Sequence, residues 1–170
     1  MTLTTVSIII ATVVYVAYNA ISLANFRVPQ SLSMTYYLWK DKANIGYLFP
    51  CMMYMMVACM MPAWISMSEG SDFQFLAFLA PASIAFVATA PAFLSSDLEN
   101  KVHSISAGIA AACSLLWVIL VTPYWWVILV WVAVVAVASY LTKTIKTAYI
   151  YWLETIAFGA TFTATIIYSI

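Results

Sequence analysis

Glu154 is the only charged side chain that lies well inside an apolar stretch of this sequence. A carboxyl group inside a membrane-spanning helix is energetically costly, so such a residue is by default a candidate functional site. Residues on the same helix face recur around it at intervals of three or four. They are Thr147, Tyr151, Phe158, Thr161, Thr165 and Tyr168. This largely polar face fits a proton or cation site, and it equally fits a buried polar contact that locks two helices together.

A second polar stripe lies in the first apolar segment and is formed by Thr5, Thr12, Tyr15, Asn19 and Ser22. Two polar stripes in lipid should face each other or a wet cavity, because unpaired polar groups are costly there. Each of the two apolar segments has one end next to basic residues. Measured from that end, Asn19 and Glu154 both lie roughly 9–10 Å into the membrane. We therefore expect a direct or water-bridged hydrogen bond between them, with Tyr15 and Tyr151 nearby. These four residues are the candidate ion or substrate site.

His103 is the single histidine of the chain and closely follows Lys101 at the start of an apolar segment. One histidine cannot supply both axial ligands of a bis-histidine haem, and structural zinc needs about four ligands. Two interpretations stay open for His103. It is either an interfacial histidine near the lipid headgroups or a pH-sensing or catalytic residue.

Met52, Met56 and Met60 sit four residues apart on one stripe, beside Cys51 and Cys59. Thioether and thiolate ligands select Cu(I), so copper binding is one interpretation of this spacing. The other is that methionine fills an apolar helix interface, which its flexible side chain does well. We expect no further metal site and no cofactor.

The composition indicates a helical membrane protein. Of the 170 residues, 66% are hydrophobic and only 7% are charged, with a formal net charge of zero. A soluble domain of this size needs far more polar surface, and disorder needs high charge, so both are excluded. Nucleic-acid binding is not expected without a basic patch. No nucleophile–base constellation stands out, and the four glycines form no phosphate-binding loop, so nothing points to an enzyme.

The apolar segments predict one transmembrane domain, 1–170, that is an all-α bundle of six helices. Each helix needs roughly 20 mostly apolar residues. Pro123 divides an apolar run, 102–141, that is too long for one span. The predicted spans are about 6–26, 46–67, 73–94, 102–122, 124–141 and 148–168.

All basic residues fall in alternate connections between these spans. They are Arg27, Lys40 and Lys42, then Lys101, then Lys143 and Lys146. Because basic residues stay on the cytoplasmic side, both termini are predicted to be extracytoplasmic. The cell membrane, in a bacterium the inner membrane, is the expected location.

Two further segments carry distinct signals. The connection 27–45 contains Tyr36, Tyr37 and Trp39 before its lysines, which indicates an interfacial anchor or a segment that gates a cytoplasmic opening. In the fourth span, small residues recur every four positions, which favours close helix packing. They form three series, namely Ser106, Ala110 and Ser114, then Ala107 and Ala111, and then Gly108 and Ala112.

Four stretches together resemble an uncharacterised family of small polytopic membrane proteins of gut Bacteroidetes and their phages. They are 28–37, 75–80, 101–103 and 143–154. The resemblance covers most of the chain. It implies a membrane compartment and a helical fold, and it carries no activity.

Two classes of function remain. The first is a small transporter or channel that uses Glu154 as a proton or cation site. The second is a non-catalytic membrane protein, such as a subunit, an assembly factor or a phage-encoded envelope modifier. Water reaching Glu154 would favour the first class, and a dry, fully hydrogen-bonded Glu154 the second. The lipid bilayer is the expected partner, and a second copy of the chain or another membrane protein stays open.

The topology can be tested by labelling single cysteines in intact cells. A cysteine at the C-terminus should react with an impermeant reagent from outside, and one at 143–146 only after the inner face is exposed. Cytoplasmic labelling of the C-terminus would contradict the six-span arrangement.

Overall fold

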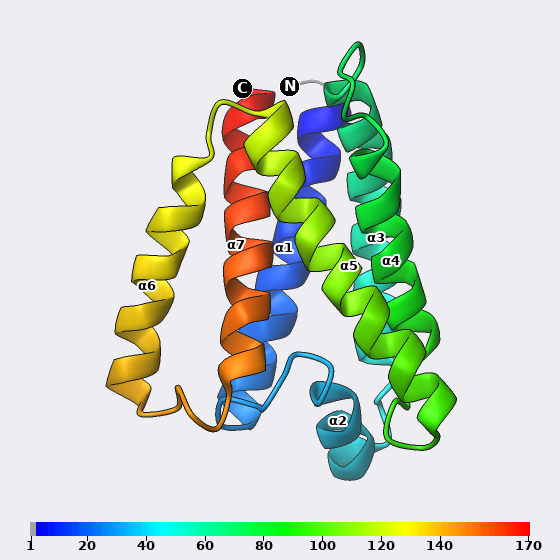
Figure 1. Cartoon of the computed structure of the whole chain (residues 1–170). Coiled ribbons are helices and arrows are strands. Elements are labelled where there is room, and N and C mark those ends of the chain that lie inside the picture. The colour runs from blue at the N-terminus through cyan, green and yellow to red at the C-terminus, as the bar shows by residue number, and fades with distance from the viewer. Residues whose placement is uncertain (1–2) are drawn as a thin grey trace.

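The computed structural model describes residues 3–170, and the regular secondary structure in this range is entirely α-helical (Figure 1). The seven helices are α1 (Leu3–Asn25), α2 (Thr35–Ala43), α3 (Leu48–Met67), α4 (Leu76–Thr89), α5 (Asp97–Val121), α6 (Trp126–Thr142) and α7 (Tyr149–Ser169). Four of them are long and apolar enough to cross a membrane, namely α1, α3, α5 and α7. The helices α4 and α6 are apolar but shorter, with 14 and 17 residues.

Two helices have bounds that differ from the predicted spans for local reasons. The segment predicted at 73–94 is helical only over Leu76–Thr89, because Pro91 disfavours helical geometry at the residue before it. The segment predicted to begin at 102 begins at Asp97. Ser96 caps this helix by accepting a hydrogen bond from the Glu99 N–H, so the polar first turn is helical although it is not apolar.

Five helices form a closed ring in the order α1, α3, α4, α5 and α7, with α7 packing back on α1. The short helix α2 packs against α3, and α6 lies outside the ring against α7 (Figure 1). The side chains of Ala110 and Ser114 on α5 are buried, as predicted for a packing face, and Ser106 is half-buried. Gly108 and Ala112 are exposed, so their predicted packing role was wrong.

The two ends of the bundle differ in composition. Both termini lie at one end, together with the α3–α4 and α5–α6 turns (Figure 1). The other end carries α2, the α4–α5 connection and the α6–α7 connection, where the basic residues of the chain are found. The end with the termini is closed by a pair of stacked indoles, Trp64 and Trp117, whose ring centroids lie 4.5 Å apart. The indole N–H of Trp64 donates to Thr165 and that of Trp117 to Ser68, so α3, α5 and α7 are joined here.

At the basic end, α2 packs on the protein rather than on lipid alone. The Trp39 side chain is buried, and its indole N–H donates to the Ser22 hydroxyl over 3.1 Å. Its ring also meets Phe26 edge to face. The Tyr18 hydroxyl shares a hydrogen bond with the Thr35 hydroxyl. Of the aromatic residues predicted as an interfacial anchor, Trp39 therefore fastens α2 to the end of α1, whereas Tyr37 contacts Phe93 and accepts a hydrogen bond from the Leu94 N–H.

The helix α6 is held to α7 through one close approach. The indole N–H of Trp131 donates to the Thr163 hydroxyl over 3.0 Å. The same indole ring lies against Gly159, where an added Cβ atom would come within 2.5 Å of it. Gly159 is therefore required by the distance between these two helices rather than by its backbone angles.

Gly159→Ala should lower the free energy of unfolding by about 1–3 kcal/mol, because the Trp131 ring must move away from α7. Gly108→Ala is the matched control. An added Cβ there meets no atom within 4 Å, and replacing a glycine inside a helix stabilises it by roughly 0.5–1 kcal/mol. Unfolding in mixed micelles measures both variants, and equal effects would contradict the close approach.

Candidate functional site

The segment 28–34 between α1 and α2 docks against the first turns of α7. The helix α7 has no side-chain cap. Instead, the carbonyl oxygen of Gln30 accepts a hydrogen bond from the Tyr151 N–H over 3.1 Å. Two residues further along, the Leu32 N–H donates to Oε2 of Glu154 over 2.6 Å. A backbone carbonyl and a backbone N–H of one segment thus satisfy two polar groups of α7.

Glu154 and Asn19 do not form the predicted direct hydrogen bond. Glu154 accepts from Leu32, whereas Asn19 Oδ1 accepts from the Tyr151 hydroxyl over 3.3 Å. The Asn19 amide nitrogen donates to the Tyr15 carbonyl of its own helix over 3.0 Å. The asparagine side chain is short and returns to the local backbone, while the longer tyrosine side chain crosses to the neighbouring helix. The link between the first and last helices is therefore made by Tyr151.

The two polar stripes nevertheless face each other, as predicted. Besides the Tyr151–Asn19 bond, the Thr5 hydroxyl donates to the carbonyl oxygen of Ser169 at the far end of α7. Between these two contacts, the buried Tyr15 ring lies 4.9 Å from the Phe158 ring and 5.3 Å from the Phe162 ring, measured between centroids. The α1–α7 contact is thus polar at its ends and aromatic in its middle.

His103 holds the same segment from the opposite side. Its side chain is buried, and it stacks on Phe93 with ring centroids 4.5 Å apart. Nδ1 lies 2.9 Å from the Ala90 carbonyl oxygen, and Nε2 lies 2.8 Å from the Ser33 hydroxyl. A carbonyl oxygen only accepts, so Nδ1 carries a proton, and in the neutral ring Nε2 accepts from Ser33. The segment is therefore hydrogen-bonded to α7 through Leu32 and to α5 through the adjacent residue, Ser33.

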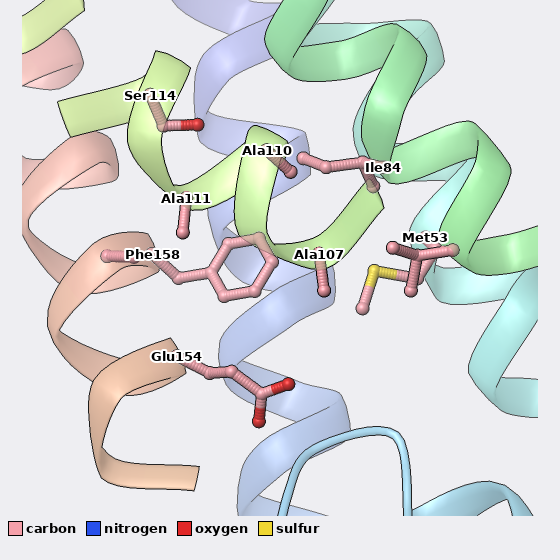
Figure 2. Close-up of a pocket in the computed structure, with 10 residues that line it drawn as sticks. Met53, Ile84, Ala107, Ala110, Ala111, Ser114, Glu154 and Phe158 are labelled. Atoms are coloured by element: carbon pink, nitrogen blue, oxygen red, sulfur yellow. The ribbon is translucent and has the colours of Figure 1, made fainter. Parts of the chain in front are cut away.

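A pocket of about 320 Å³ lies between α5 and α7 beside this segment. We call it the α5–α7 pocket; its lining includes Ser33, His103, Gly108, Ile150, Leu153 and Glu154. Glu154 also lines a second pocket of about 50 Å³ inside the bundle, together with Met53, Ile84 and Phe158 (Figure 2). Figure 2 shows its carboxyl group pointing away from α7 into the space between the helices. Glu154 therefore lies at the boundary between an open pocket and the bundle interior.

A third pocket, of about 20 Å³, continues from the second and shares Ile84, Ser114 and Phe158 with it. A volume of this size is enough for one water molecule. It is lined by Trp64 and by Thr161, whose buried hydroxyl oxygen has no hydrogen-bond partner in the part of the chain described. The three pockets thus follow one another from the basic end of the bundle to the stacked indoles.

The predicted copper stripe is divided among different surroundings. Met56 and Met60 line the 20 Å³ pocket, whereas Met52 is buried and lines none of the three pockets. Within residues 3–170, no group of three or more histidine, cysteine, aspartate or glutamate side chains could hold a metal ion. The buried methionines belong to the main hydrophobic core, which is the interface-filling interpretation.

Sequence reasoning missed the segment 28–34 as a partner of both titratable residues. The groups that meet α7 are backbone atoms of Gln30 and Leu32, and a backbone N–H or carbonyl carries no side-chain signature. Ser33 is one of several serines in the chain, and nothing in its spacing from His103 indicates a contact. Comparisons with family models, with curated proteins and with solved structures find no match to this chain.

Ser33→Ala should destabilise the protein by about 1–3 kcal/mol, because it leaves Nε2 of the buried His103 without its partner. Amide hydrogen exchange in the segment 28–34 should accelerate at the same time. Ser104→Ala is the matched control, since Ser104 lines the same pocket but bonds only to Asn100 of its own helix. Unchanged exchange in the Ser33 variant would show that His103 does not hold the segment.

Proposed function

We propose that the protein is a polytopic membrane protein whose six apolar helices all cross the bilayer, with both termini extracytoplasmic. Four helices are long enough by themselves, and α4 and α6 connect the same two ends of the bundle in Figure 1. All basic residues gather at the end opposite the termini, which is the end that stays in the cytoplasm under the positive-inside rule. In a bacterium the proposed location is therefore the inner membrane.

We further propose that it is a small transporter or channel in which Glu154 is the proton or cation site. The observation that carries this proposal is that Glu154 lines both the α5–α7 pocket and the 50 Å³ pocket inside the bundle. A carboxyl group that serves only to lock helices has no need of such access. Intramembrane carboxyl groups that face a cavity typically mark ion pathways or proton relays.

The surroundings of Glu154 suit a site that loads from the cytoplasmic half of the bundle. Glu154 lies five residues into α7, roughly 8 Å from the start of that helix. From the α5–α7 pocket toward the other end of the bundle, the pocket volumes decrease from about 320 to 50 to 20 Å³. The smallest pocket ends at the Trp64–Trp117 stack. The structure therefore fits a state that is open at the cytoplasmic end and closed at the other, as alternating access requires.

A non-catalytic membrane protein is the second candidate, and one observation favours it. The hydrogen bond from Leu32 to Glu154 fastens the segment 28–34 to α7, which by itself is a structural role. In that case Glu154 would stabilise the bundle without any ion passing it. The two candidates differ in whether a neutral side chain of the same shape can replace Glu154.

Glu154→Gln should abolish proton or cation flux into proteoliposomes and keep the fold. The amide oxygen of glutamine still accepts from the Leu32 N–H, so the melting temperature should stay within about 3 °C of the wild type. Flux is measured with a pH-sensitive dye inside the vesicles, under an imposed potential and with several monovalent cations.

Glu69→Gln is the control, because Glu69 is exposed in the turn after α3. It should leave the flux unchanged. Wild-type flux in the Glu154 variant, or no flux above that of empty vesicles in the wild type, would contradict transport at this site.

A further inference from the structure

We propose that the α5–α7 pocket binds an amphipathic organic cation, an amine with a hydrocarbon body, and that Glu154 is its counter-charge. This inference rests on the proposed function and names the ligand class of the same site. Three properties of the pocket support it, namely its size and opening, its charge, and the lack of ligands for a bare ion.

The pocket has the size and position of a small-molecule site. Its volume of about 320 Å³ is within the range of roughly 300–1,000 Å³ that is usual for ligand pockets. At its mouth, Ile150 and Leu153 are 42% and 61% exposed. In a membrane these side chains meet hydrocarbon, so a molecule with a hydrocarbon body can enter from the side without first crossing a polar surface.

The charge of the pocket selects a cation. Glu154 is the only acidic residue that lines it, and none of the lining residues is a lysine or an arginine. His103 needs no further partner, because its two ring nitrogens already bond to Ala90 and Ser33. Glu154 makes one hydrogen bond among residues 3–170, from the Leu32 N–H, and a carboxylate can accept several. An ammonium group would supply the charge-assisted hydrogen bonds that remain unmade.

The rest of the lining selects against a bare ion. Metal cations need several oxygen, nitrogen or sulfur ligands around them, whereas Glu154 faces Ala107, Ala111 and Gly108 of α5 across the pocket. These residues offer hydrocarbon and empty space, and the three serine hydroxyls of the lining, on Ser31, Ser33 and Ser104, already bond to Met34, His103 and Asn100. A ligand that fills this volume must therefore carry its own apolar surface next to its positive charge.

Gly108 allows the pocket to be closed without disturbing the fold. An added Cβ atom at this position meets no other atom within 4 Å. Gly108→Leu should fill part of the pocket. It should not lower the melting temperature, because leucine is a better helix former than glycine. Ala112→Leu is the matched control, since Ala112 is exposed one turn further along α5 and does not line the pocket.

The test uses the full chain in nanodiscs of phosphatidylcholine and phosphatidylglycerol, which contain no primary amine. Radiolabelled phenylbutylamine is the probe, and unlabelled phenylbutanol and phenylbutyrate are its neutral and anionic analogues. Binding is measured by scintillation proximity after subtraction of partitioning into empty nanodiscs. Unlabelled phenylbutylamine should displace the radiolabelled probe, whereas phenylbutanol and phenylbutyrate should not. Glu154→Gln and Gly108→Leu should each weaken its affinity by about tenfold or more, whereas Ala112→Leu should change it by less than about twofold.

Equal competition by phenylbutanol would show that the pocket accepts any apolar molecule, a lipid chain included, and would overturn the proposal. So would unchanged binding in the Gly108 variant, because the amine would then lie elsewhere. The result is independent of the flux experiment. Wild-type flux that depends on Glu154, without amine binding, would remove this inference and leave Glu154 as a proton or inorganic cation site.

Discussion

The attachment of the segment 28–34 between α5 and α7 is the contact on which the basic end of this protein depends. Leu32 binds Glu154 on one side and Ser33 binds His103 on the other. Figure 1 shows α5 inclined to α7, so that the two helices separate toward this end. The segment occupies the resulting space, and the α5–α7 pocket is what remains of it. Two neighbouring residues thus bridge α5 and α7 at this end of the bundle.

The same contact gives Glu154 two roles that do not exclude each other. In a nonpolar environment a carboxyl group needs a partner, and the Leu32 N–H provides one without adding a charge. An ammonium group at Glu154 would compete for the same oxygen atoms. Binding at the proposed site would therefore be physically coupled to the contact between Leu32 and Glu154.

The two ends of the bundle are built from different interactions. Large aromatic surfaces close the end with the termini, where Trp64 and Trp117 stack and each indole N–H has a hydroxyl partner. At the basic end the segment 28–34 is held to Glu154 and His103 by single hydrogen bonds, next to the small residues of α5, while Trp39 packs on Phe26. Stacked buried indoles contribute more contact area than isolated hydrogen bonds.

The sequence by itself determined the helices, their apolar character and the facing stripes of α1 and α7. These follow from hydropathy and from the helical repeat, which are properties of neighbouring residues. It also singled out Glu154, because a charge inside an apolar segment is visible without any structure.

What only the tertiary structure decided is which group meets that charge. Asn19 lies at the expected depth, but Tyr151 takes it, and Glu154 turns to the backbone of Leu32. Likewise, the four-residue spacing of Gly108 and Ala112 predicted packing, whereas the inclination of α5 leaves them exposed and makes Gly108 part of a pocket. Helix inclination and backbone partners arise from contacts between distant segments, and no local pattern encodes them.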